Sequence, residues 1–443
     1  MGGVSAIPQR PSGPARAAAL SVARAATVAD AKWDVLLVCV AAYMMTSVGR
    51  IHQLFPALEV IHPAALTGAL AIGLYLFDQR PDRKAAHLLV RTTKYLVALL
   101  ALMMLSVPGA LSQGNSFELV FGNFVKTVLM YMVVVGAVRG VRDVERLAAV
   151  YLVAATVYAA VVISRFDLGA GDAWRLGRLY YYDANDFATF TVTAVPLGIY
   201  FLHAGRHRLL RALTAGALAI LALAFVRTGS RGGFIGLLAV AAFIVARYTG
   251  IPLRWRVSAT ALVAVVVVAT ASEQYWTQMG TIMADGDYNR TDESGRLQIW
   301  QRGVGYMLQY PLLGVGPNNF PVAEGTLSPF AARQQYGIGV RWMAAHNSLV
   351  QVGTELGFPG LIVFVIFVAS AFTALRRAGR RDGAPPGDDA KRPQLAQALT
   401  GSMIGFVVGA FFLSLGYSEM LYTLVALAVA LQKVTIMPSR ERR

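Results

Sequence analysis

The sequence predicts an all-α, polytopic integral membrane protein with about twelve transmembrane helices. The chain is 56% hydrophobic and only 14% charged, and its mean hydropathy is +0.53. Its apolar segments recur at lengths that cross a hydrocarbon layer of ~30 Å. The formal net charge of +16 could suggest nucleic acid as a partner. The lysines and arginines, however, fall in short loops between apolar segments, as the positive-inside rule expects, so the predicted environment is membrane lipid and not nucleic acid.

The apolar segments define the predicted helices one by one. The predicted spans are 33–49, 61–77, 92–108, 117–138, 147–164, 186–204, 209–226, 231–247, 256–272, 347–375, 395–414 and 419–437. With the N-terminus in the cytoplasm, each loop on that side is rich in Lys and Arg. We therefore expect both termini in the cytoplasm and the remaining loops in the periplasm or exterior.

Five regions follow from these spans. We predict a cytoplasmic tail at 1–32, nine helices within 33–272, a large periplasmic loop at 273–346, three helices within 347–437 and a second tail at 438–443. The first tail lacks a small-residue cleavage site after an apolar core, so a signal peptide is not indicated. The single cysteine, Cys39, lies within the first predicted span and offers no disulfide or Cys-based metal site.

The large loop contains one predicted amphipathic helix. From Arg296 to Leu308 apolar residues recur at helical spacing, and Pro311 follows the pattern. Such a helix is typical of one that lies on the outer leaflet with its apolar face toward lipid. A loop of ~70 residues with structure of its own is expected to serve function.

His346 follows this loop directly and precedes an apolar span. A neutral imidazole at the water boundary can accept a proton near neutral pH. The alternative interpretation is a histidine that caps the helix or anchors it at the interface.

Two arginines also begin outward-facing helices. Arg231 follows Ser230, a potential helix cap, and Arg296 opens the amphipathic helix. Arginine beside free N–H groups at a helix N-terminus is suited to phosphate. The alternative for each arginine is a lipid headgroup contact at the interface.

Six further residues are candidates for substrate binding. They are Arg175, Arg178, Tyr182 and Asn185 in the shorter outer loop, Arg227 in the turn before Arg231, and Lys126 within the fourth span. The tyrosines could stack on sugars or form an aromatic belt. Lys126 is a functional candidate because a lysine within a span is costly, although pairing with Glu118 would also explain it.

Metal and nucleotide chemistry find little support in the residues. His346 has no His or Cys at ligand spacing. No phosphate-binding loop, dinucleotide fingerprint or nucleophile elbow is present. We therefore expect no metal and no cofactor.

Together these segments resemble the O-antigen ligase and polymerase superfamily. The histidine segment matches its signature, and two arginine segments and one acidic segment match further motifs, with Ala184 where the family's Asp-Pro-Asn motif has proline. The matching segments are His346-Asn-Ser-Leu with Glu355, Gly357 and Gly360; Thr228-Gly-Ser-Arg231-Gly; Ser294-Gly-Arg296 with Trp300, Pro311, Gly314 and Gly316; and Asp183-Ala-Asn185-Asp186.

The resemblance implies transfer of a glycan from undecaprenyl pyrophosphate to a sugar acceptor at the periplasmic face of the bacterial inner membrane, without metal or nucleotide. His346 would take the acceptor proton, and Arg231 and Arg296 would stabilise the pyrophosphate. Direct displacement would invert the anomeric configuration.

Three members of the superfamily remain open, with ligase favoured. One dominant outer loop favours O-antigen ligase, whose acceptor is lipid A–core. O-antigen polymerase, whose acceptor is lipid-linked glycan, and protein O-oligosaccharyltransferase are the alternatives. From a different class, a lipid or glycan transporter is also considered, but no pair of interrupted helices in matching halves supports it.

Overall fold

The computed structural model describes residues 32–80, 83, 90–165, 174–176, 181–205, 207–283, 292–336, 342–380 and 391–436. Nearly all of the first predicted tail, the whole second tail and Arg178 lie outside these ranges. The described residues form helices and connecting turns, and no strand occurs among them. The prediction of an all-α fold is therefore confirmed.

Each predicted span coincides with a helix. These helices are α2 (Val35–Ser47), α5 (Pro63–Phe77), α6 (Arg91–Ser106), α8 (Val125–Ala137), α9 (Val141–Arg165), α10 (Ala184–Ala204), α11 (Arg208–Thr228), α12 (Arg231–Arg247), α13 (Leu253–Thr270), α18 (Ser348–Ala378), α19 (Lys391–Ala410) and α20 (Glu419–Ile436). Within the described residues, seven helical segments are long and apolar enough to cross a membrane, and α2 and α5 are shorter apolar helices. The polytopic class is thus confirmed, whereas the count of twelve spans stays a prediction.

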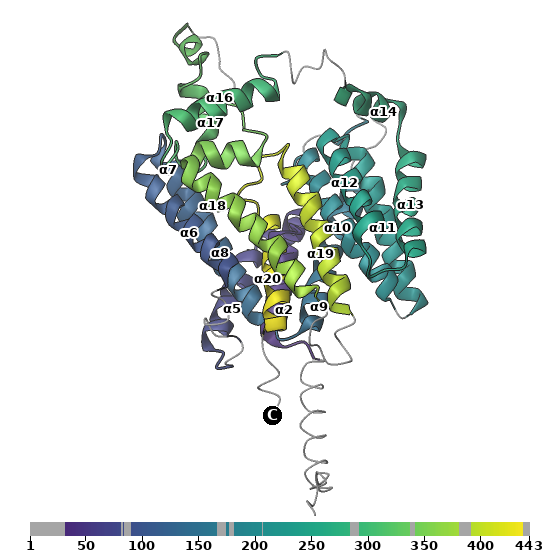
Figure 1. Ribbon diagram of the computed structural model, residues 1–443. Helices are drawn as coiled ribbons and strands as arrows, with labels where there is room; N and C mark the ends of the chain where they lie inside the picture. Colours follow the sequence, from purple (N-terminus) through teal and green to yellow (C-terminus); the bar gives the residue numbers. More distant parts are fainter. Residues whose placement is uncertain are drawn as a thin grey trace, which may run out of the picture.

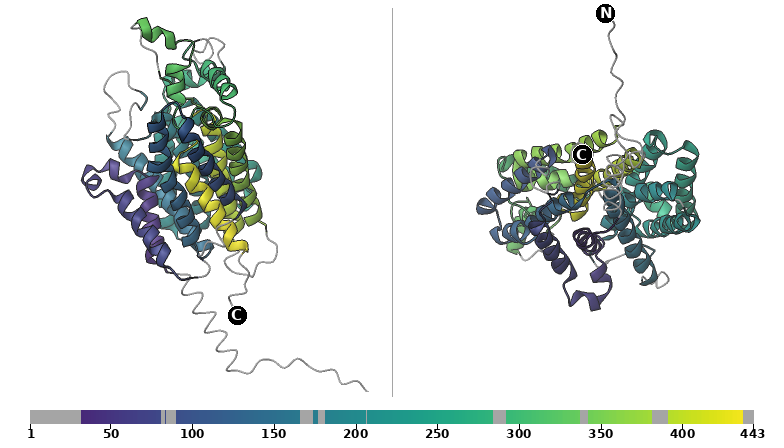
Figure 2. Two further views of the ribbon diagram at one scale, coloured as in Figure 1. Left: turned by 90° about the vertical axis from the view of Figure 1, so that its left-hand side faces the viewer. Right: turned by 90° about the horizontal axis from the view of Figure 1, so that it is seen from below.

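Short helices connect the long ones or extend them. They are α3 (Ile51–Leu54), α4 (Pro56–Glu59), η3 (Val107–Gly109), α7 (Gln113–Phe117), the π-helical η4 (Glu118–Phe124), α14 (Glu273–Gly280), η5 (Thr281–Met283), α16 (Arg296–Gln309), α17 (Phe320–Thr326) and η6 (Ala331–Tyr336). In Figure 1, α14, α16 and α17 lie beyond the same end of the bundle, and Figure 2 agrees for the green α16–α17 segment. The predicted amphipathic helix is confirmed as α16.

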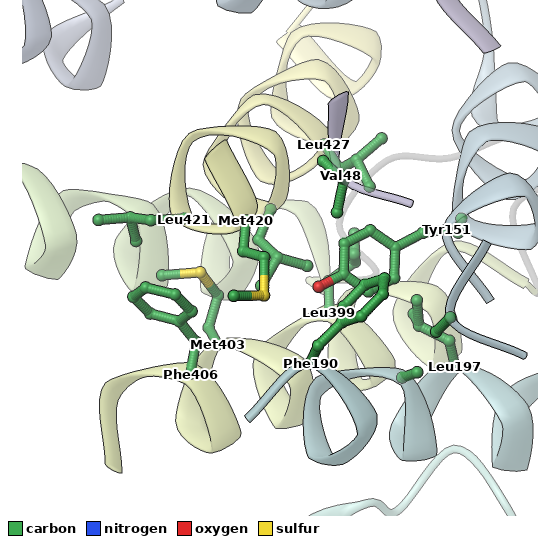
Figure 3. Packing of buried hydrophobic residues seen from close by; sticks show 14 of the residues in the cluster. Val48, Tyr151, Phe190, Leu197, Leu399, Met403, Phe406, Met420, Leu421 and Leu427 are labelled. Carbon is green, nitrogen blue, oxygen red and sulfur yellow. The ribbon is translucent and has the colours of Figure 1, made fainter. Parts of the chain in front are cut away.

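The centre of the bundle is built around α10, α19 and α20. Figure 3 shows Phe190 of α10 beside Tyr151, and Met403 of α19 near Met420 of α20. These four side chains are at most 1% exposed, because a helix that is apolar on every face can be buried on every face. The first turn of α10 lies at the end of the bundle that carries α14 and α16, because Asn185 shares one pocket with Gln278 of α14 and Arg296 of α16.

Candidate functional site

The turn between α11 and α12 presents Arg231 at a helix N-terminus. Gly229 adopts a left-handed conformation (φ 56°), which glycine tolerates best. Ser230 then caps α12, because its Oγ accepts from Gly233 N at 3.1 Å. The Arg231 guanidinium donates to Thr281 Oγ1 at 2.8 Å. Arg231 is thus held between the start of α12 and the segment that follows α14.

Arg175 lies against the same turn. Its Nε donates to Thr228 O at 2.7 Å and its Nη2 to Asn185 Oδ1 at 3.1 Å. Asn185 in turn lies in the first turn of α10, which Asp183 caps by accepting from Asn185 N at 2.7 Å. Two predicted binding residues, Arg175 and Asn185, are therefore brought into contact.

One pocket collects the arginines that the sequence singled out. Arg175, Arg231 and Arg296 all line it, together with Asn185 and Ser230, around an empty volume of about 400 Å³ that opens to solvent. The three arginines come from a loop, the start of α12 and the start of α16. Three guanidinium groups around one open pocket form a setting for a multiply charged anion.

His346 is held in an uncommon backbone conformation. Its φ is 47°, in the left-handed region, which costs a non-glycine residue of the order of 1–3 kcal/mol. Its backbone N donates to Ser414 Oγ at 2.9 Å. Ser348, at the start of α18, donates to Leu413 O at 2.8 Å and accepts from Leu415 N at 2.9 Å. Because Leu413 also lines the arginine pocket, the His346 segment adjoins that pocket.

The surroundings of His346 favour its neutral form. Burial lowers the pKa of the imidazole, the positive charge of Arg296 lowers it further, and the carboxylate of Asp183 acts in the opposite direction. A neutral imidazole near neutral pH has a nitrogen that accepts a proton. Arg296 of the pocket and His346 therefore lie within electrostatic reach of each other.

Helix α16 supports the histidine segment from the side. Trp300 Nε1 donates to Ala345 O at 3.1 Å, next to His346 in the chain. The Trp300 ring also meets Phe411 edge to face, with centroids 5.5 Å apart. One short helix thus fixes both Arg296, at its start, and the backbone that precedes His346.

The remaining residues of the histidine signature have a structural role. Gly357 breaks α18 with φ 67°, and a Cβ there would lie 2.5 Å from Pro311 O. Phe358 N donates to that same oxygen at 2.9 Å. Buried Glu355 accepts from Phe320 N at 3.1 Å. The signature therefore locks the segment between α16 and α17 against the break in α18.

Other predicted site residues lie away from the pocket lining. Tyr182 is buried and its hydroxyl donates to Val48 O at 2.6 Å. Lys126 is exposed on α8, and among the described residues it makes no ion pair, with Glu118 or any other carboxylate. Arg227 accepts from Leu176 N at 2.8 Å through its carbonyl. Their binding roles stay predictions.

Sequence reasoning missed three residues that line the pocket, Gln278 of α14 and both Phe412 and Leu413 after α19. Gln278 lies in an eight-residue helix that no strong pattern announces, and Phe412 falls within an apolar run predicted as a span. Neither stretch carries a local signal of a site. The polar side chains that line the pocket carry guanidinium, amide and hydroxyl groups. The described ranges hold no group of three His, Cys, Asp or Glu suited to a metal ion.

The fold and the pocket define a polytopic membrane protein with a cationic pocket beside a neutral histidine. The family model described as O-Antigen ligase matches residues 216–365, a range that includes Arg231, Arg296 and His346. This match confirms the resemblance to the O-antigen ligase and polymerase superfamily. It implies glycosyl transfer of the ligase or polymerase kind on lipid-linked glycans. A search of curated proteins finds no match.

Proposed function

We propose that the chain is an O-antigen ligase that moves O-antigen from undecaprenyl pyrophosphate to a sugar of lipid A–core. The observation that carries the proposal is the convergence of Arg175, Arg231 and Arg296 around one pocket that adjoins His346. A pyrophosphate leaving group needs cations, and a sugar hydroxyl needs a base during attack. Both needs are met by residues from separate parts of the chain.

The proposed reaction is a single displacement. The acceptor hydroxyl oxygen bonds to C1 of the donor sugar while the bond from C1 to the pyrophosphate oxygen breaks. The electron pair of that bond stays on the pyrophosphate, and the hydroxyl proton passes to the His346 imidazole. Attack opposite the leaving group inverts C1. Arg231 and Arg296 offset the charge that grows on the pyrophosphate, and neither metal nor cofactor is needed in this scheme.

Arg175 and Asn185 are assigned to substrate binding because they line the pocket and contact each other. The site is placed on the periplasmic side of the inner membrane, with both termini in the cytoplasm. The support for this orientation is the excess of Lys and Arg in the opposite loops.

The test is a lipopolysaccharide gel from ligase-deficient cells with a matched core and O-antigen. Wild type should restore the long ladder on lipid A–core, and His346→Ala at equal membrane level should not. Lipid A–core that stays bare beside lengthened lipid-linked glycan would instead support the polymerase. Glycan found on protein would support the oligosaccharyltransferase.

A transporter is separated from these enzymes by removing the membrane. Purified protein in detergent should transfer glycan from a lipid-pyrophosphate donor to lipid A–core, whereas a transporter would leave both substrates unchanged. If His346→Ala transfers as fast as wild type in this assay, the base role is wrong.

A further inference from the structure

The pocket has a neutral side as well as a cationic one. Gln278 of α14 and Phe412 of the connection between α19 and α20 line it together with the arginines. A pyrophosphate has no use for an aromatic ring, and three guanidinium groups already offer it many donors. The neutral residues are therefore available to a part of the ligand other than its pyrophosphate.

Gln278 is fixed relative to the proposed phosphate site. The backbone carbonyl of Gln278 accepts from Thr281 Oγ1 at 2.8 Å, and the same hydroxyl accepts from the Arg231 guanidinium at 2.8 Å. Ser272 caps α14 by accepting from Tyr275 N at 3.3 Å. Among the described residues no hydrogen bond engages the Gln278 side-chain amide. A positioned amide with donor and acceptor capacity therefore lies in the pocket wall next to Arg231.

Phe412 is held against the start of α12. A Cβ at Gly232 would lie 3.0 Å from Phe412 Cβ, so glycine lets the ring approach the start of α12. The Phe412 backbone N donates to Gly409 O at 2.9 Å. Its ring meets Phe411 edge to face at 5.2 Å. Since Phe411 packs on Trp300, the Phe412 ring has little freedom to turn away.

An aromatic ring and a planar amide together match the chemistry of a pyranose. The C–H groups on one sugar face pack on an aromatic ring, and the substituents at the sugar's edge exchange hydrogen bonds with an amide. In a sugar pyrophosphate, the ring bonded to the phosphate must lie directly beside the arginines. The substituent at C2 is the edge group nearest to the reacting C1.

Resting on the proposed function, we infer that Phe412 and Gln278 form the subsite for the first sugar of the donor, with Gln278 selecting for a hydrogen-bonding substituent at C2. Phe412 supplies the stacking surface and Gln278 exchanges hydrogen bonds with the hydroxyl or acetamido group. Because a site built to bond a polar group strongly disfavours an analogue that lacks it, the pocket discriminates against 2-deoxy sugars.

The test measures binding separately from transfer. Full-length protein in detergent is titrated calorimetrically with two short-chain polyprenyl pyrophosphate monosaccharides, one with a C2 hydroxyl or acetamido group and one 2-deoxy. Wild type should bind the first about 10-fold or more tightly than the second. Gln278→Ala should reduce that ratio to near one while keeping the affinity for the 2-deoxy donor. Gln274→Ala, an exposed change on the same helix that does not line the pocket, should keep the wild-type ratio.

Changes at Phe412 are expected to alter the affinity for both donors. Phe412→Leu should weaken binding of both donors by a similar factor of about 5 to 10, and Phe412→Tyr should restore it. The inference is overturned if wild type binds both donors equally, or if Gln278→Ala weakens both by the same factor. Lack of transfer to lipid A–core with the binding pattern intact would count against the ligase function alone. Lack of any donor binding by wild type would count against both.

Discussion

Two groups of arginines in this protein have contrasting surroundings. At one end of the bundle, 2%-exposed Arg83 forms ion pairs with Asp34 and Asp78, and Arg139 Nε lies 2.8 Å from Asp143. Around the site pocket, Arg231 donates to the Thr281 hydroxyl and Arg175 to the Asn185 amide, and no carboxylate is among the described residues that line the pocket. An arginine that faces a buried carboxylate holds helices together, whereas we expect arginines that line an open pocket to be placed for binding an anion.

The largest expected effect is the loss of stability when Arg83 is replaced. Arg83→Met should leave the Asp34 and Asp78 carboxylates without their buried partner and destabilise the protein by about 3–5 kcal/mol. The thermal midpoint and folded yield in detergent measure this loss. Arg80→Met is the matched control, because Arg80 also approaches Asp34 (3.4 Å) with a side chain that is 53% exposed, and its loss should cost less than about 1 kcal/mol. Equal stability of the two variants would contradict the distinction.

Arg231 should show the opposite behaviour. Arg231→Gln is expected to lower the rate of glycan transfer by about 10² to 10³, because a group that stabilises charge in the transition state is lost. The thermal midpoint should change little. Arg247→Gln, at the exposed far end of the same helix, serves as the control and should transfer normally. A fall in stability that matches the fall in activity would place Arg231 with the structural arginines.

A smaller effect is expected at Ser414. Ser414→Ala removes the acceptor for the backbone N of His346, at a cost of about 1 kcal/mol. The histidine should leave its left-handed conformation more often, so kcat should fall about 10-fold with KM nearly unchanged. Ser402→Ala provides the comparison, because it deletes a buried hydroxyl that bonds only within α19. If both variants lose activity equally, Ser414 does not position His346.

The pH profile gives the finest distinction. The pKa of His346 is lowered by burial and by Arg296. Its proton-accepting form therefore persists to a pH below the usual pKa of histidine, and the acid limb of the pH profile of kcat/KM should lie at that lower pH. Arg296→Gln removes a positive charge that disfavours imidazolium, so the limb should move to higher pH. Asp183→Asn removes the opposing charge and should move it lower. Unchanged limbs in both variants would show that another group titrates.

Hydrophobicity and local caps made the helices predictable. Each span, and α16 with Arg296 at its start, could be placed because apolar runs and helix signals are properties of neighbouring residues. The pocket depends on contacts between distant residues. Arg231 and Thr281 are 50 positions apart, and His346 and Ser414 are 68. The sequence suggested sugar stacking or an aromatic belt for Tyr182. Its burial could not be predicted because it too depends on a distant contact, with Val48, 134 positions away.

The break at Gly357 gives the site a mechanical property. An unbroken helix from Ser348 to Ala378 would behave as one rod, and a change in bilayer thickness that tilts the rod would move both of its ends. Here the turns before the break bond to the segment after Pro311, because Val315 N and Gly316 N donate to Thr354 O and Glu355 O at 2.9 and 3.0 Å. The longer part beyond the break makes a separate contact, from Phe358 N to Pro311 O. We expect a change of tilt beyond the break to be transmitted to His346 less than it would be along an unbroken rod.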